Sequence, residues 1–405
     1  MRKMTPLKQL ISCDEALKRI QESIMPIERT ETISIENALG RVLTEDLVAN
    51  MSVPPFDRAA MDGYAVKAKD TYGASKSKPR TLILVQTLHA GESSTKTLGS
   101  GECIQVATGS QIPKGADAVV MVEITERNDS SVSILEPVRL EENISPKGED
   151  IEKGQVILKG GEPLSPAKVG VLAALGKKEV GVYAKPRVAI VPTGTEIKEV
   201  GSVLGEGQVY DVNSYTLTVV VDKNGAIPAR IRAVPDEVEE LRRVIKKLVD
   251  FDMIVFSGGS SVGERDLLSE VIQGLGEVIF HGIQIKPGKP TLFALMDEKP
   301  VFGMPGYPTS CLNNAYLLLV PAIRHMARLP PRIERTVRVP LAERLVSSSD
   351  RTQFVTVRVG SGQAYPVFKH SGAITSMSEA DGYIILPTSA NVIEKGQEVT
   401  VFLFD

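Results

Sequence analysis

The sequence lacks tryptophan and holds only three cysteines and four histidines among its 405 residues. Cys13, Cys103 and Cys311 lie far apart and form no C-x-x-C pair, so neither a disulfide framework nor a zinc site is expected. The histidines show no metal-ligand spacing either. Chemistry on this chain is therefore expected to come from carboxylates, lysines and backbone groups.

Long apolar runs and an excess of positive charge are also missing. No stretch approaches the roughly 18 consecutive apolar residues of a membrane span, and the N-terminal MRKMTPLKQL leads into a polar helix instead of a secretory signal. The formal net charge of −3 argues against a nucleic-acid binder. We therefore expect a cytoplasmic protein that binds neither membranes nor nucleic acid. A chain of this length predicts about two to four domains.

Different patterns follow one another along the chain. Residues 12–24 are typical of an amphipathic helix, and short alternating runs from about 80 to 160 predict a small all-β unit. Strands and helices alternate over 186–328, which predicts an α/β fold with a doubly wound parallel sheet. Asn213 is expected to be the N-cap of one of these helices. After Pro330–Pro331 the pattern returns to β and predicts a sandwich or barrel.

The stretch IVFSGGSSVGERD, residues 254–266, joins an apolar strand to a glycine-rich turn that opens a helix. Backbone N–H groups and the helix dipole favour an anion at such a place. The candidate residues of this turn are Ser257, Gly258, Gly259, Ser260, Ser261 and Gly263. The turn matches neither the G-x-x-x-x-G-K-[ST] phosphate loop nor G-x-G-x-x-G. Taken alone, it is equally explained by the need of many α/β loops for glycine.

Further loops are expected at the same sheet edge, because ligands of open α/β sheets bind beyond the carboxyl ends of the strands. They are PTGTE (192–196), VPDE (234–237), KPGKP (286–290) and GMPGYP (303–308). Each alone is compatible with a solvated or rigid turn. Together with the charges of Lys286 and Lys289, they predict a site for a phosphate-bearing ligand.

Carboxylates crowd this predicted edge, where Glu196, Asp236 and Asp266 follow three of the strands. Each one taken singly is as well explained as a helix cap or a solvated loop charge. Beside a phosphate ligand, however, acidic side chains favour Mg²⁺ coordination, since hard oxygen ligands suit a hard cation.

A second informative stretch is PPFDRAAMDGYAV, residues 54–66, which contains Asp57 and Asp62 and shows no clear period. One interpretation is a loop that crosses between domains and uses its aspartates to cap turns. The other is a substrate loop contributed to a site elsewhere. The residues alone do not decide between them.

Seven blocks of this sequence resemble one known family. They are PPFDRAAMDGYAV, ATGSQIPKGADAVVMVE (107–123), KGEDI (147–151), SGGSSVGERD, KPGKP, GMPGYPTS and SGAITSMSEADGYI (371–384). All look like blocks of the molybdopterin molybdenumtransferases, the molybdenum insertases whose animal relatives include the E domain of gephyrin. The blocks occur in the family's order and cover roughly residues 10 to 400.

This resemblance implies a subunit of four parts. An elongated linker domain is expected from residues 1–28 with 43–53 and 143–180, and a small β domain from 54–142. A molybdopterin-binding-like α/β domain is expected from 29–42 with 181–328, and a C-terminal β-barrel domain from 329–405.

The resemblance also implies a reaction and its partners. The protein is expected to insert molybdate, or tungstate, into adenylylated molybdopterin with Mg²⁺ and to release AMP. It is expected to form a homodimer with a shared active site, with molybdopterin adenylyltransferase as the upstream donor of its substrate.

Carried over position by position, the resemblance assigns functional roles to residues in these blocks. The residues implied as catalytic are Asp62, Asp150, Glu196, Asp236, Asp266 and Lys286, of which Asp236 and Asp266 are the expected metal ligands. Those implied in binding, beyond the glycine-rich turn, are Asp57, Thr108, Lys289, Pro305, Gly306, Pro308 and Ser376. Two positions depart from the family pattern: Ala59 stands in place of the usual serine, and Thr195 in place of an aspartate.

Two alternative functions are weighed against the insertase. The related domain type that adenylylates molybdopterin carries a similar SGG loop, but it is usually the α/β domain alone. A non-catalytic scaffold or molybdopterin-binding module would not need the full set of carboxylates and lysines. Because this chain has the additional parts and fills those positions, the insertase is favoured.

Overall fold

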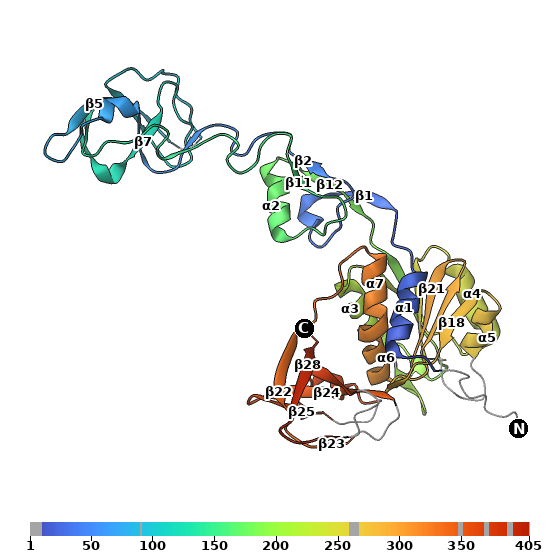
Figure 1. The fold of residues 1–405 in the computed structure, drawn as a ribbon. Coiled ribbons are helices and arrows are strands. Elements are labelled where there is room, and N and C mark those ends of the chain that lie inside the picture. Colours follow the sequence, from blue (N-terminus) through green and yellow to red (C-terminus); the bar gives the residue numbers. More distant parts are fainter. Residues whose placement is uncertain are drawn as a thin grey trace, which may run out of the picture. The chain divides into compact units, whose positions relative to one another are not determined.

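The computed structural model describes residues 10–89, 91–258, 267–346, 351–367, 372–386 and 392–404 (Figure 1). The chain forms two compact units. Unit 1 contains residues 1–31, 40–42 and 182–405, and unit 2 contains residues 32–39 and 43–181. The strands β1 (Thr30–Ser34) and β12 (Glu179–Tyr183) lie where the chain passes from one unit to the other.

The centre of unit 1 is a six-stranded sheet in the order β16-β13-β17-β21-β20-β18. The first four strands pair in parallel, and the last two pair antiparallel. The bounds are β13 (Arg187–Pro192), β16 (Ile227–Arg230), β17 (Met253–Ser257), β18 (Glu277–His281), β20 (Leu292–Met296) and β21 (Lys299–Met304). The sequence patterns did not predict the antiparallel hairpin β20–β21, whose second strand delivers the 303–308 turn to the carboxyl edge.

Helices cover both faces of this sheet, as Figure 1 shows. Along β13, Val188 and Ile190 pack into one apolar cluster, whereas Ala189 and Val191 pack into another on the opposite face. The first cluster includes side chains of α1 (Cys13–Ser23), α3 (Asn213–Lys223), α6 (Pro308–Asn314), a π-helical turn (Ala315–Leu319) and α7 (Val320–Met326). The second includes side chains of α4 (Val238–Lys247) and α5 (Leu267–Gln273). The predicted doubly wound α/β architecture is therefore present.

Helix α1 lies in unit 1, not in the linker domain to which residues 1–28 were assigned. Ser12 caps it by accepting the backbone N–H of Glu15 at 3.1 Å. Ala16 and Ile20 are fully buried in the apolar cluster on one face of the sheet. The amphipathic pattern correctly predicts a buried helical face, but it does not indicate which domain buries that face.

The C-terminal part of unit 1 is a sheet in the order β19-β24-β26-β28-β22, with β25 paired to β24. Its strands are β19 (Ile285–Lys286), β22 (Thr336–Pro340), β24 (Thr352–Gly360), β25 (Gln363–Pro366), β26 (Gly382–Leu386) and β28 (Glu398–Leu403). A short pair, β23 (Leu345–Val346) with β27 (Val392–Ile393), and helix α8 (Thr375–Ser378) accompany it. The pairings among the described residues do not close a barrel, so the predicted barrel is not confirmed.

Unit 2 contains a second six-stranded sheet, in the order β7-β4-β6-β5-β9-β8. Its strands are β4 (Gly63–Val66), β5 (Arg80–Leu88), β6 (Glu102–Val106), β7 (Ala118–Met121), β8 (Thr125–Asn128) and β9 (Ser131–Ile134). Its other strands and its α-helix include β2 (Leu47–Val48), β3 (Arg58–Ala59), β10 (Ile144–Ser145), β11 (Val156–Leu158) and α2 (Pro166–Ala174).

In unit 1, β14 (Ile197–Lys198) and β15 (Val209–Tyr210) form a further small parallel pair. No helix within the described ranges is both long and apolar enough to cross a membrane.

The placement of α1 predicts the effect of an Ile20→Ala substitution. Ile20 is 0% exposed, so removing its side chain leaves a cavity and should lower the free energy of unfolding of unit 1 by about 2–4 kcal/mol. Hydrogen exchange of β17 and β21 peptides under mild denaturant measures this loss separately from unit 2. Lys18→Ala, at a side chain that is 67% exposed, is the control. Unchanged protection of β17 and β21 in Ile20→Ala would contradict the packing of α1.

Candidate active site

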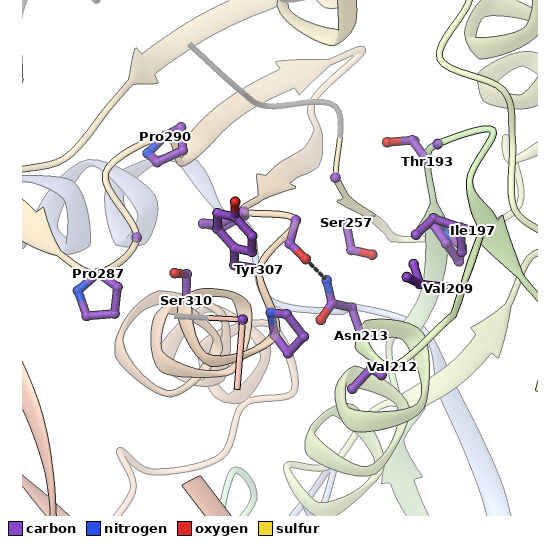
Figure 2. A pocket seen from close by; sticks show the side chains of 18 of the residues that line it. Thr193, Ile197, Val209, Val212, Asn213, Ser257, Pro287, Pro290, Tyr307 and Ser310 are labelled. Carbon is purple, nitrogen blue, oxygen red and sulfur yellow. Dashed lines mark hydrogen bonds between the residues drawn. The ribbon is translucent and has the colours of Figure 1, made fainter. Parts of the chain in front are cut away.

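A cavity of about 1030 Å³ lies where β13, β17 and β21 end (Figure 2). The wall includes the strand ends, the first residues of α3 and α6 and the 285–290 loop. The segments 193–197 and 209–212 and the residues Asp236, Arg351 and Gly372 also line it. Nine of the predicted site residues line it: Glu196, Asp236, Ser257, Gly258, Lys286, Lys289, Pro305, Gly306 and Pro308. The structure thus brings the loops predicted at one sheet edge into one cavity.

Backbone hydrogen bonds fix the strand ends against one another. The N–H of Thr193, after β13, donates to the carbonyl oxygen of Ser257 at 2.9 Å. The N–H of Gly258, after β17, donates to the carbonyl oxygen of Met304 at 3.1 Å. The three loops that follow these strands therefore start from fixed positions, which limits how far the cavity wall can move.

Gly258 meets a steric requirement at this point. Its φ angle is +96°, and a Cβ atom there would lie 2.6 Å from the carbonyl oxygen of Thr193. Any side chain at this position would push the loop away from β13. The other predicted residues of the turn, Gly259, Ser260, Ser261 and Gly263, lie outside the described residues together with Asp266. The phosphate site of the whole turn therefore stays a prediction.

Charges of both signs border the cavity. Lys286 and Lys289 come from the 286–290 loop, and Arg351 comes from the C-terminal part of the chain. Glu196 and Asp236 supply carboxylates. Sequence reasoning did not predict Arg351, because no local pattern indicates that the residue before β24 reaches the α/β sheet. β19 pairs with β24 in parallel, and this pairing brings the two segments together.

Sequence reasoning also missed the role of the DVNS segment at the start of α3. Asn213 is the first residue of the helix and not its N-cap, which is Val212. The N–H of Ser214 in the first turn is bonded by the carboxylate of Asp211 at 3.0 Å. The amide of Asn213 instead donates from Nδ2 to the carbonyl oxygen of Gly306 at 2.8 Å (Figure 2). This bond ties α3 to the 303–308 turn. An aspartate two residues before Asn213 was the available sequence signal for the cap.

Ser376 lies near the cavity without lining it. Its hydroxyl is 2% exposed, donates to the carbonyl oxygen of Ala373 at 2.9 Å and lies 3.3 Å from the hydroxyl of Thr309. Ser376 thus links α8 to α6 in the described structure. Its predicted role in binding stays a prediction.

The remaining predicted residues, Asp57, Asp62, Thr108 and Asp150, are exposed residues of unit 2. The carboxylate of Asp62 accepts both the N–H (2.6 Å) and the hydroxyl (2.8 Å) of Thr108. These two hydrogen bonds, first that from the backbone and then that from the hydroxyl, lower the pKa of Asp62. The carboxylate of Asp57 accepts the N–H of Lys147 at 2.7 Å. The resemblance pairs Asp62 and Thr108 as site residues, and here they are directly bonded.

The donor atoms around the cavity bear on the expected magnesium ion. Within the described ranges, no group of three histidine, cysteine, aspartate or glutamate side chains lies close enough to hold a metal. Mg²⁺ is usually bound by one or two carboxylates together with substrate phosphates. Asp236 and Glu196 are carboxylates on a cavity that also carries lysines, so the oxygen donors fit a magnesium ion shared with a phosphate ligand.

The Asp62–Thr108 contact predicts a measurable pH effect. Thr108→Val removes the hydroxyl donor, so the pKa of Asp62 should rise toward its ordinary value while the backbone donor remains. Because a lowered carboxylate pKa stabilises the fold above the unfolded pKa, the wild type should lose this stability as pH falls through the folded pKa. Carboxyl-carbon NMR titration measures the shift. Thr108→Ser keeps a hydroxyl and is the matched control, and identical Asp62 titrations in Val and Ser variants would contradict the contact.

Three family descriptions, all concerned with MoeA or molybdopterin binding, match successive parts of the chain. The family description "MoeA N-terminal region (domain I and II)" matches residues 11–176, and "Probable molybdopterin binding domain" matches residues 189–325. The description "MoeA C-terminal region (domain IV)" matches residues 338–404.

Individual relatives are similar over nearly the whole chain. The molybdopterin molybdenumtransferase of Bacillus subtilis is 33% identical, over 100% of this chain and 95% of its own. That of Staphylococcus aureus is 32% identical over 97% of this chain and 95% of its own. Two crystal structures of the molybdopterin biosynthesis protein MoeA from Pyrococcus horikoshii superpose with TM-scores of 0.85 and 0.82, at 39% and 34% identity. Each covers 98% of this chain and 100% of its own. The chain therefore belongs to the MoeA family of molybdopterin molybdenumtransferases.

Proposed function

We propose that the protein inserts molybdenum into molybdopterin, taking molybdate, or tungstate, and adenylylated molybdopterin as substrates and releasing AMP. The observation that carries the proposal is the cavity at the sheet edge. It is lined by lysines and carboxylates, and the backbone of Gly258 lies close against that of Thr193 beside it. The names of the curated relatives support the same reaction class.

The phosphates of the substrate would lie at the end of β17. Lys286 and Lys289 would neutralise their charge. Lys286 and Lys289 would act as point charges, and the planar guanidinium of Arg351 would bind an oxyanion through two N–H groups. The apolar side chains of Ile197 and Val209 border the same cavity and suit a flat ring system (Figure 2).

Asp236, with Asp266, would hold Mg²⁺ against the phosphates. When bound, this ion would neutralise developing charge on the phosphate oxygens. The protein needs no soft metal ligand of its own, because the pterin dithiolene supplies sulfur for molybdenum. No cysteine or histidine is among the described lining residues. Cys311 lies behind the cavity, and burial, with the nearby charge of Asp211, raises the pKa of its thiol.

Since the described part of the cavity wall offers neither a thiolate nor an imidazole, a covalent adenylyl–enzyme is disfavoured. An oxygen of water or of molybdate would attack the phosphoanhydride instead. The new P–O bond forms at the phosphorus of the AMP half, the bond from that phosphorus to the bridging oxygen breaks, and the bridging oxygen stays on the pterin phosphate. With water as the nucleophile this gives AMP directly and the protons of the water pass to solvent, whereas with molybdate a water molecule must then cleave the adenylyl–molybdate bond to release AMP. The residues named above act by orientation and electrostatics. A well-placed oxyanion would couple this cleavage to metal insertion.

The proposed coupling predicts how AMP release depends on the oxyanion. With adenylylated molybdopterin and Mg²⁺ alone, release should be slow, and it should rise when molybdate or tungstate is added. Asp236→Asn should reduce the stimulated rate about a hundredfold while the pterin stays bound, since one stabilising group is lost. Chromatographic measurement of AMP and of protein-bound pterin checks both outcomes.

Asp222→Asn, at an exposed carboxylate of α3 away from the cavity, is the matched control and should behave as wild type. AMP release that is equally fast without any oxyanion would leave a simple hydrolase in place of the insertase.

We also propose a homodimer in which each active site uses Asp62 and its loop from one subunit and the cavity of the other. This predicts that Asp62→Ala and Asp236→Ala are each inactive alone, whereas the co-expressed population regains about a quarter of the wild-type activity and purified mixed dimers show about half. Half of randomly assorted dimers are mixed, and each mixed dimer has one intact site of two. Activity of tagged, purified mixed dimers measures this. Mixed dimers as inactive as either parent would exclude the shared site.

The proposed substrate also implies an upstream enzyme and a cellular compartment. An adenylyltransferase acting on molybdopterin would supply the adenylylated pterin. A cytoplasmic location fits a reaction that depends on this labile intermediate.

A further inference from the structure

The loop 286–290 that carries the two cavity lysines has an unusually complete set of backbone partners. The carbonyl oxygen of Lys289 accepts the N–H groups of Ile283 and Thr291, both at 3.0 Å. The carbonyl oxygen of Gly288 accepts the hydroxyl of Thr291 at 3.0 Å. The loop is therefore anchored from one side by its own flanking residues.

Two asparagines anchor the same loop from the other side. Nδ2 of Asn314 donates to the carbonyl oxygen of Gly288 (2.8 Å) and to the hydroxyl of Thr291 (2.6 Å). Nδ2 of Asn313 donates to the carbonyl oxygen of Pro287 at 3.3 Å. In Figure 2, Pro287 and Pro290 lie beside the helix that bears Ser310, and this helix ends with the two asparagines.

The contact between Asn314 and the loop is close enough to require glycine. Gly288 has φ +114°, and a Cβ atom there would lie 2.4 to 2.8 Å from the amide atoms of Asn314. The backbone of the loop thus lies directly against this side chain. The glycine of KPGKP is explained by this packing as well as by its turn.

The asparagines are exceptional for their place in the fold. Both are 0% exposed at the end of α6, next to a helix stretch whose Ala315, Leu318 and Leu319 belong to the apolar core. Directly after them the helix widens into the π-helical turn, a rare form that recurs near functional sites. Buried amides need partners, and beyond their contact with each other these two donate to Pro287 and Gly288 of the lysine loop and to Thr291 directly after it. Neither asparagine lines the cavity itself.

We propose that Asn313 and Asn314 are positioning residues, which hold the 286–290 loop so that Lys286 and Lys289 meet the phosphate end of the ligand. They touch no substrate and act through the two lysines. The inference rests on the proposed function, since it takes the ligand of the lysines to be the phosphate of an adenylylated pterin. The inference states that the affinity for the ligand depends on the side-chain amides of Asn313 and Asn314, which contact the loop but do not line the cavity.

A double-mutant cycle tests this mechanism, with AMP as the probe and calorimetry as the measurement. Asn314→Ala should weaken AMP binding about tenfold, as expected when a charge-assisted contact is misplaced. In a variant with both Lys286→Ala and Lys289→Ala, the same substitution should change the affinity by less than about twofold, because the groups it positions are gone. AMP-release kinetics should show the loss mainly in KM and little in kcat.

Asn224→Ala is the matched control. Asn224 is the buried C-cap residue that follows α3, its Nδ2 also donates to a backbone carbonyl, that of Val220 at 2.8 Å, and it does not line the cavity. It should lower the melting temperature comparably and leave AMP affinity unchanged. If Asn314→Ala does not fold, Thr291→Val provides the same cycle, because it removes the hydroxyl that bonds both Asn314 and Gly288.

Three outcomes would overturn the inference. The first is an unchanged AMP affinity in folded Asn314→Ala or Thr291→Val, with Lys286→Ala still weakening binding, which leaves the proposed function intact. The second is an equal loss of affinity with and without the lysines, which would assign the asparagines a purely structural role. The third is a wild-type protein that binds no AMP, which would remove the proposed function and this inference together.

Discussion

Four parallel strands of unit 1 end at one edge, and the hydrogen bonds between the residues just beyond those ends determine much of what the cavity can do. The N–H of Thr193 donates to the carbonyl oxygen of Ser257, and that of Gly258 donates to the carbonyl oxygen of Met304. Each loop therefore has its first residues fixed by its neighbour before any side chain is considered. Gly258 can approach Thr193 only because it has no Cβ atom. The 303–308 turn starts from this frame, and the hydrogen bond from the N–H of Gly194 to the carbonyl oxygen of Val234 extends it toward the loop that carries Asp236.

The division of labour between protein and substrate follows from the chemistry of the groups present. Around the cavity the described side chains offer hard oxygen atoms and fixed positive charge. These groups suit phosphates, magnesium and a tetrahedral oxyanion, whereas a dithiolene supplies the soft sulfur that molybdenum prefers. The scarcity of cysteine and histidine in the sequence agrees with this division. In the proposed reaction the side chains of the protein orient charged groups and do not form covalent bonds to the substrate.

Local sequence patterns predicted the elements well and their long-range partners poorly. The alternation over 186–328 correctly indicated a doubly wound sheet, and the loops at its carboxyl edge were correctly placed together. The period of α1 indicated that Ala16 and Ile20 are buried, but burial against β13 and α7 is a tertiary choice that no local pattern encodes. Arg351 and Asn314 illustrate the same limit. Their roles arise from the pairing of β19 with β24 and from the hydrogen bonds of Asn314 to Gly288 and Thr291, both between segments distant in sequence.

The chain passes between the two units several times, because unit 1 is assembled from residues 1–31, 40–42 and 182–405. This has a consequence for synthesis on the ribosome. Helix α1 emerges early, yet its packing partners run from Val188 to Met326. At a synthesis rate of about 5–20 residues per second, the apolar face of α1 stays without these partners for roughly ten seconds to a minute. Unit 2 is complete before the central sheet begins, so it can fold first while α1 remains exposed to chaperones or to neighbouring nascent chains.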